Sequence, residues 1–178
     1  MEVRHAANPK DVKIYDTARL RDDFLIDGLF QEDGVKLIYS QIDRIIVGGS
    51  KPVKKAVKLE VGAELRADYF LQRRELGVIN IGGAGAVRVD GTEYSLATRE
   101  ALYVGKGAQE IIFSSSDTAN PSKFYFNSAP AHMVYPTQKI GLDKARQVQL
   151  GSMEDSNKRT IYQYIHPDVL TTCQLVMG

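Results

Sequence analysis

Residues 73–85, RRELGVINIGGAG, decide the fold together with Asp90-Gly91 and with YVGKG at residues 103–107. Short apolar runs separated by glycine-rich turns are typical of a small β-barrel or sandwich. Asp90-Gly91 predicts a tight hairpin, because both central residues of such a turn need a positive φ. We therefore predict a mostly β fold centred on residues 69–127.

Composition limits the function classes that this chain can serve. It has 178 residues, with 23 Lys and Arg against 22 Asp and Glu, so its formal net charge of +1 gives no field that would attract nucleic acid. Cys173 is the only cysteine, which excludes an internal disulfide and fits a reducing cytoplasm. The sequence has no apolar run of membrane-spanning length and no secretory signal pattern.

The regions on either side of the β-rich centre differ from it in pattern. Residues 11–30 predict a helical entry, with Thr17 as a capping residue. Residues 137–157 are polar and mixed and predict a connector. Thr160–Ile165 and Val169–Met177 predict two further strands.

Several stretches together resemble the 4-deoxy-L-threo-5-hexosulose-uronate ketol-isomerase family, also called 5-keto-4-deoxyuronate isomerases. They are IYSQIDRIIVGG (38–49), YFLQRRELG (69–77), ALYVGKG (101–107), KFYFN (123–127) with Ala131-His132, and TCQL (172–175) with Met177-Gly178. The resemblance implies a bicupin, in which two similar antiparallel β-barrels share one chain and assemble into a homohexamer. It also implies a zinc-assisted isomerase that interconverts 5-dehydro-4-deoxy-D-glucuronate and 3-deoxy-D-glycero-2,5-hexodiulosonate in pectin and uronate catabolism.

The resemblance implies how the chain divides. Residues 1–140 correspond to an N-terminal cupin-like barrel without metal ligands, and residues 141–178 to a connector with the first strands of a truncated second barrel. The family's zinc ligands, three His and one Glu, then lie outside this chain, so no residue here inherits them. An apolar strand pattern that runs to Gly178 leads us to expect a further segment beside it.

The residues themselves also argue against a metal site in the first barrel. A cupin-type site needs two His on one face of a strand shortly before a Glu, since alternate residues share a face. If Glu75 is that Glu, the matching places fall near Tyr69 and Leu71, which do not bind divalent cations. Glu110, near the second glycine turn, forms only a poor site with Glu75. The histidines, His5, His132 and His166, lack the spacing of a metal site, so we expect no metal ligand in this chain.

Arginines are the remaining candidates for binding a keto-uronate, because a guanidinium can hold a carboxylate by two parallel hydrogen bonds. We choose Arg159 for this role, since it precedes the strand expected to open the second barrel; a surface ion pair with Glu154 or Asp155 is an equal alternative. For Arg73-Arg74 beside Glu75, and for Arg44 beside Asp43, we expect structural or intersubunit ion pairs.

Two function classes remain. The first is an enzyme, a ketol-isomerase acting on a small keto-uronate in a homo-oligomer, with no nucleic acid or membrane partner and no assigned catalytic residue. The second is a non-catalytic cupin-like module for assembly or sugar binding. A second barrel with His-x-His, a following Glu and a distant His elsewhere in the full gene product would favour the enzyme.

Overall fold

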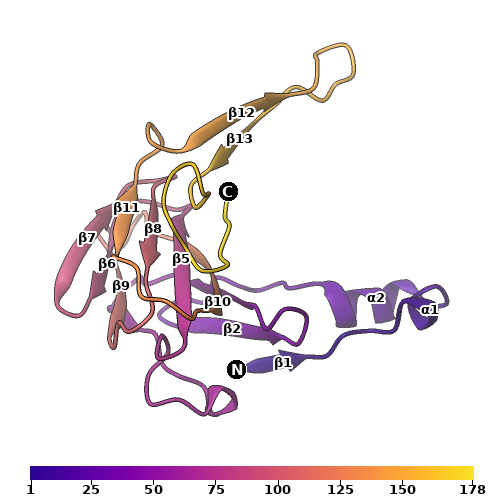
Figure 1. Cartoon of the computed structure of the whole chain (residues 1–178), viewed down its shortest axis with the longest axis horizontal. Coiled ribbons are helices and arrows are strands. Elements are labelled where there is room, and N and C mark those ends of the chain that lie inside the picture. Colours follow the sequence, from indigo (N-terminus) through magenta and orange to yellow (C-terminus); the bar gives the residue numbers. More distant parts are fainter.

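The computed structural model describes residues 1–178, all of the chain, and most of its regular structure is β (Figure 1). The elements in chain order are β1 (Glu2–Arg4), α1 (Pro9–Val12), α2 (Thr17–Phe24), β2 (Val35–Ser40), β3 (Ile46–Ser50), β4 (Val57–Lys58), the 3-10 helix η1 (Ala63–Leu65), β5 (Arg74–Asn80), β6 (Gly85–Val89), β7 (Thr92–Leu96), β8 (Ala101–Val104), β9 (Ile111–Ser115), β10 (Phe124–Pro130), β11 (Gln138–Ile140), β12 (Arg146–Leu150) and β13 (Arg159–Gln163).

Two sheets build the body of the molecule. The larger has seven strands in the order β1-β2-β3-β10-β5-β8-β11, and the smaller has four in the order β4-β9-β6-β7. Neighbouring strands are antiparallel, except that β1 runs parallel to β2. The predicted mostly β, cupin-like antiparallel fold is confirmed, although its sheets remain open and do not close into a continuous barrel.

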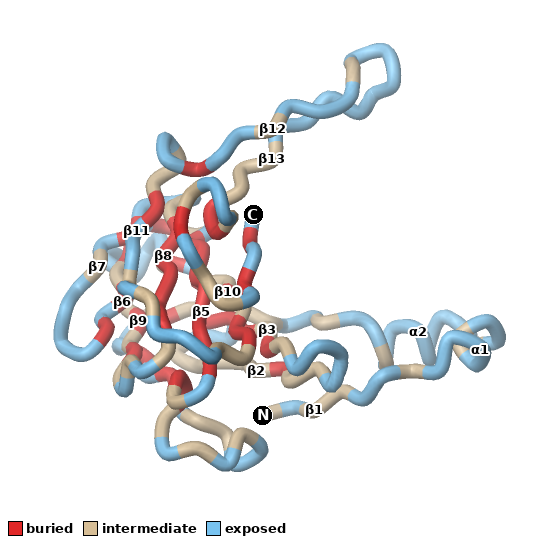
Figure 2. Tube along the Cα trace, in the orientation of Figure 1, coloured by how far each residue is buried: buried red, intermediate tan, exposed pale blue.

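The main core lies between these two sheets. It contains 15 buried apolar residues, contributed by both sheets and by the loop that precedes β5. Phe113 of β9 stacks on Phe126 of β10 with ring centroids 5.4 Å apart, and the ring centroid of Phe124 lies 5.2 Å from that of Phe113. Rings of this size bury much of the apolar surface of a small domain, so this contact holds the sheets together. Figure 2 shows the buried residues gathered in the body.

Strand β5 is buried on both faces, as all seven of its residues are. Leu76 and Val78 belong to the core between the sheets, whereas Ile79 belongs to a second buried cluster on the outer face of the larger sheet. The outer face at Gly77 is also covered, because a Cβ there would meet side chains of residues 165–177 within 3 Å. Alternation of side chains along the strand explains the division.

Residues 164–177 cover that outer face as an irregular segment. The strand predicted over Val169–Met177 is wrong, because the only ladder contact of this stretch is one antiparallel bridge from Met177 to Ile165. Its Tyr164, Ile165, Leu170, Leu175 and Met177 are buried against the sheet. The apolar pattern thus predicted burial correctly but not the backbone conformation. An apolar run can be buried in a segment made of turns as well as in a strand.

The predicted hairpin at Asp90-Gly91 is confirmed and joins β6 to β7. Both residues have a positive φ, 46° for Asp90 and 84° for Gly91, as a tight turn of this kind requires. Asp90 also accepts hydrogen bonds from the backbone N–H groups of Gln109 and Glu110, at 2.9 and 2.8 Å. Its carboxylate therefore fixes the loop before β9 as well as the turn.

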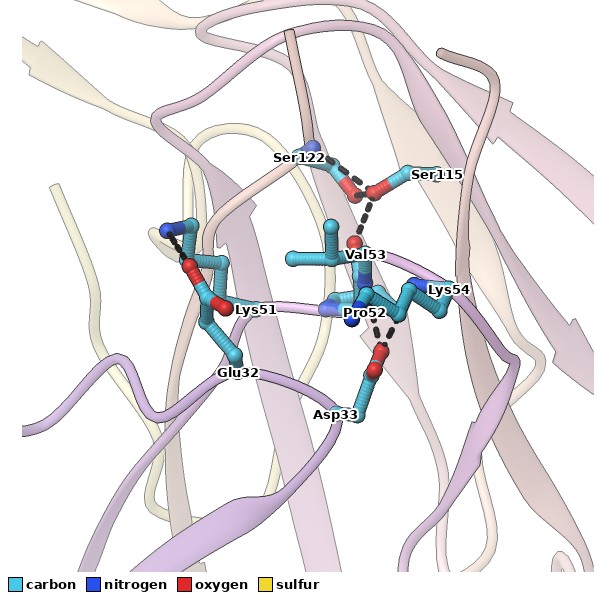
Figure 3. A network of polar contacts seen from close by, with 8 residues as sticks. All are labelled: Glu32, Asp33, Lys51, Pro52, Val53, Lys54, Ser115 and Ser122. Carbon is cyan, nitrogen blue, oxygen red and sulfur yellow. Dashed lines mark hydrogen bonds and ion pairs between the residues drawn. The ribbon is translucent and has the colours of Figure 1, made fainter. Parts of the chain in front are cut away.

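A polar network holds the loop that carries the chain from β3 to β4 (Figure 3). Asp33 Oδ1 accepts the backbone N–H groups of Val53 and of the two lysines after it, at 2.7, 2.9 and 3.3 Å. These bonds lower the pKa of Asp33 below its usual value, and the bond from Val53 has the largest effect. Ser115 Oγ contacts the carbonyl oxygen of Pro52 and lies 2.8 Å from Ser122 Oγ. The loop is therefore tied to both sheets.

Two segments project from the body, and both differ in detail from the sequence predictions (Figure 1). The helical entry over residues 11–30 is in fact two short helices, α1 and α2. Asp16, not Thr17, caps α2 by accepting the N–H of Arg19 at 2.8 Å, because the residue before the first helical turn reaches that donor. The connector at 137–157 contains two strands, since β11 pairs with β8 and β12 forms a hairpin with β13.

No helix here combines the length and the apolar surface that crossing a lipid bilayer requires. The division of the chain into residues 1–140 and 141–178 stays a prediction.

Candidate functional site

Glu75, the candidate metal ligand, points to the outer face of the larger sheet and not between the sheets. Its side chain is fully buried. Oε2 accepts the Tyr103 hydroxyl at 2.7 Å and the N–H of Cys173 at 2.9 Å, and Oε1 accepts the N–H groups of Gln174 and Leu175, both at 2.7 Å. A carboxylate has about four lone-pair sites, and four donors occupy them here. Glu75 therefore anchors residues 173–175 and is not available to a cation.

The other positions of the expected metal pattern do not approach Glu75. Leu71 is buried in the core between the sheets, and Tyr69 lies in the turn before β5, where strand alternation does not apply. Glu110 lies just before β9 and pairs with Lys58 at 3.4 Å. Across the chain, no group of three or more His, Cys, Asp or Glu side chains could hold a metal ion. The residues present do not fit a zinc site.

Tyr103 was not singled out by the sequence, yet it completes the Glu75 site. It is fully buried on β8, and burial first, then its hydrogen bond to Glu75, raise its pKa above the usual value for tyrosine. It therefore stays protonated and donates to Glu75 throughout the neutral range. The signal present in the sequence was the antiparallel pairing of the two glycine-bounded strands, which places Tyr103 opposite Gly77.

Arg159, the predicted substrate-binding residue, is the first residue of β13 in the projecting hairpin. Its side chain is exposed and donates to Asn157 Oδ1. It forms no ion pair with Glu154 or Asp155, so the alternative of a surface pair is not seen within this chain. Its role in binding substrate stays a prediction.

The ion pairs expected for Arg73, Arg74 and Arg44 are not formed within the chain. Arg74 has the same orientation along β5 as Leu76 and Val78, so it faces the core side of the sheet while Glu75 faces away. Adjacent residues on a strand cannot reach each other across it. Alternation within RRELGVI gives Arg74 the parity of the apolar Leu76 and Val78, but the apolar Ile79 has the parity of Glu75, so the sequence leaves the core side undecided.

Residues 24–178 match the family model described as KduI/IolB family. Over all 178 residues the chain is 56% identical to a protein of Lachnoclostridium phytofermentans named 4-deoxy-L-threo-5-hexosulose-uronate ketol-isomerase. An Escherichia coli protein of the same name is 55% identical over 180 aligned residues, again with the whole chain covered. The chain spans 64% and 65% of the length of these two relatives.

Among solved structures, an IolB-like protein of Salmonella typhimurium superimposes with a TM-score of 0.56 at 12% sequence identity. The match covers 71% of this chain and 46% of that one. At this identity the likeness concerns the fold alone.

Proposed function

Because this chain belongs to the KduI/IolB family, we propose that the protein of which it forms at least a part is a ketol-isomerase that interconverts 5-dehydro-4-deoxy-D-glucuronate and 3-deoxy-D-glycero-2,5-hexodiulosonate. The observation that carries the proposal is 56% identity, over the whole chain, to a relative named for this activity. The proposed setting is breakdown of pectin and other uronate polymers in the cytoplasm, by a homohexamer.

We place the proposed zinc ion outside residues 1–178, because the side chains of this chain do not fit one. When bound, zinc would polarise the oxygens of the substrate during proton transfer between neighbouring carbons. The part that Glu75 plays in this function is structural. Glu75 fastens residues 173–175 to the body, and these come soon after the β12–β13 hairpin in the chain.

Arg159 is the residue of this chain that we assign to substrate binding. It is exposed on the projecting hairpin, where its guanidinium can meet a carboxylate held by another part of the protein. Two parallel hydrogen bonds from one guanidinium would orient a keto-uronate for proton transfer.

An isomerase assay with zinc analysis tests this function directly. The full-length gene product should interconvert the two sugars and contain bound zinc, whereas residues 1–178 alone should do neither. In the full-length protein, Arg159→Lys should raise KM about tenfold through loss of bidentate binding. Arg88→Gln, an exposed arginine on β6, is the matched control and should leave KM unchanged.

Two results would contradict the proposal. A full-length protein that binds zinc but shows no turnover would favour the non-catalytic module for assembly or sugar binding. Stoichiometric zinc and turnover in residues 1–178 alone would show that the metal site had been placed in the wrong part of the protein.

A further inference from the structure

A small cavity lies beside the start of β5, near the N-terminus of the chain. Its volume is about 180 Å³, which is smaller than the pockets that take drug-sized ligands, about 300 Å³ and above. The residues that give it its character are Tyr39, Arg44, Glu64, Phe70, Arg73 and Arg74. The cavity therefore suits a small molecule and is lined by three arginines and one glutamate.

Arg74 is the central group of this cavity. The residue is 6% exposed, and no carboxylate lies within ion-pair distance of it. Nε donates to Ser128 Oγ at 3.0 Å, and Nη2 donates to the carbonyl oxygens of Ser128 and Arg44 at 2.7 and 2.6 Å. These neutral acceptors fix the plane of the guanidinium but leave its charge without a counter-ion.

The third nitrogen of Arg74, Nη1, has no hydrogen-bond acceptor in the structure. The only side-chain polar atom that is both buried and unpartnered is Asn127 Oδ1, so Nη1 is reached by solvent. Arg74 lines the cavity, and its Nη1 carries two N–H groups without an acceptor. An aligned donor that is charged and partly desolvated is the usual basis of anion recognition.

The surroundings of Arg74 are positive and lack a compensating acid. Burial, opposed by Tyr39 and reinforced by Arg44, lowers the pKa of Arg74 to about 10, so the guanidinium stays charged at neutral pH. The Arg74 guanidinium carbon lies 5.8 Å from the centre of the Tyr39 ring. Glu64, the one acidic residue of the cavity, lies 3.7 Å from the amino group of Met1.

The backbone around the cavity is built to keep these groups in place. Asp43 and Arg44 both have a positive φ, 53° and 52°, in the turn between β2 and β3, and this turn directs the Arg44 carbonyl at Arg74. Arg73 donates to the carbonyls of Leu65 and Arg66 and so fixes the loop over the cavity. Two successive non-glycine residues in the left-handed region are uncommon and are maintained only where the surrounding structure enforces them.

We propose that this cavity binds the carboxylate group of a small organic acid, a sugar acid of the uronate class or smaller. The carboxylate lies on Arg74 Nη1, and the carbon skeleton lies against the apolar wall that includes Phe70. Apolar residues on one side favour a carboxylate with a carbon skeleton over a fully hydrated inorganic anion. The inference does not depend on the proposed isomerase activity, because Arg74 lies on β5 in the body of the molecule and not on the projecting hairpin.

Calorimetric titration of the full-length protein with D-galacturonate tests the inference, with D-galactose as the neutral probe and inorganic phosphate as the competing anion. D-galacturonate should bind and D-galactose should not. Arg74→Lys should weaken the binding about tenfold, since one ammonium cannot hold the oxygens of Ser128 and Arg44 and also place an N–H where Nη1 lies. Arg44→Asn removes a charge at the cavity, keeps a residue that tolerates a positive φ, and should weaken binding about threefold.

Arg88→Gln is the matched control. It removes one exposed guanidinium on β6, a strand of the smaller sheet whose residues do not line the cavity, and it should leave the affinity unchanged. Circular dichroism checks that Arg74→Lys is folded. If that variant does not fold, the affinity of Arg44→Asn for D-galacturonate tests the inference in its place. Absence of D-galacturonate binding, or equal binding by all variants, would overturn the inference. Phosphate binding as tight as D-galacturonate binding would also overturn it, since the site would then recognise any anion. Either result leaves the isomerase assay unaffected.

Discussion

The two faces of the seven-stranded sheet are closed in different ways. The inner face meets a second sheet, and its cover consists of apolar side chains from regular strands such as Val87 and Phe113. The outer face meets residues 164–177, which make a single bridge to one another and form no strand. Here a buried carboxylate, Glu75, accepts the backbone N–H groups that a strand would have paired with its neighbour.

This difference shows two solutions to the same requirement. Backbone N–H groups that leave water must find acceptors, and a sheet supplies them with its own carbonyls. An irregular cover cannot do so, and therefore depends on side chains from the surface that it covers. The inner interface should then tolerate the loss of any single polar group, whereas the outer interface should depend on one residue.

Glu75→Gln should give the largest effect, and it should be confined to the outer face. The amide keeps one acceptor but turns a donor toward N–H groups of residues 173–175, and each buried donor left unpaired costs about 1–3 kcal/mol. We expect the free energy of local opening at these amides to fall by about 3–5 kcal/mol. Native-state hydrogen exchange of the full-length protein, followed at residues 173–175, measures this.

Glu110→Gln is the control for that experiment. It removes the other carboxylate considered for a metal site, which is half exposed and pairs with Lys58, so exchange at residues 173–175 should be unchanged. Equal loss of protection in the inner strands β6 and β9 after Glu75→Gln would show that the two faces are not independent.

Gly77→Ala should have the next largest effect. Together with Gly48→Ala, it tests how the outer and inner faces of the sheet respond to the same substitution. A Cβ at Gly77 would lie 2.4 Å from Ile165 Cδ1 and 2.9 Å from Leu175 Cδ2, so the segment must move, at a cost of about 1–3 kcal/mol in local opening. Gly48→Ala on the inner side would place a Cβ 2.1 Å from the Phe126 ring and should lower the stability of the whole fold. Hydrogen exchange separates local opening from global unfolding.

Gly34→Ala controls for the loss of glycine itself, because its Cβ would meet no atom closer than 3.8 Å and its φ is not in the left-handed region. It should leave exchange at both faces unchanged. If Gly77→Ala instead raised exchange throughout the fold, residues 164–177 would be part of the central folding unit and not a separate cover.

The inner face could be predicted from the sequence and the outer cover could not. The short apolar runs between glycine-rich turns and the Asp90-Gly91 turn depend on neighbouring residues, so they identified β5, β6 and β7 correctly. The cover is fixed by contacts between Glu75 and residues 173–175, which lie 98 to 100 positions later in the sequence. No local pattern reports such a contact, and Val169–Met177 therefore looked like a strand.

The candidate site shows the same limit. The sequence identified Glu75 as the acidic residue that precedes the first glycine turn, and in the structure its carboxylate accepts four hydrogen bonds. It did not identify Tyr103 as the partner of Glu75, or Arg74 as the charged residue on the core side, because both depend on which face of a strand each residue occupies. That assignment comes from the packing of the second sheet.

Tyr103→Phe should give the smallest effect and adds a pH dependence to the comparison. The change removes one of four donors to Glu75, and we expect local opening of residues 173–175 to become easier by about 1–2 kcal/mol at neutral pH. The pKa of Tyr103 is raised in the folded state above 10.0, its value in a model compound. Its contribution is therefore fully present below pH 10 and is lost as pH rises through and beyond that value, because Tyr103 exposed by opening of the cover then ionises while the covered Tyr103 does not.

The difference in opening free energy between the wild-type protein and Tyr103→Phe should thus be constant from pH 6 to 9 and decrease above pH 10. Using the difference removes the titration of the other eight of the nine tyrosines, which both proteins share. A difference that grows with alkaline pH would mean that Tyr103 ionises readily beside Glu75, and the carboxylate would then be held by the three backbone N–H groups alone. In that case the outer cover would resemble the inner sheet more closely, since both would depend on backbone donors.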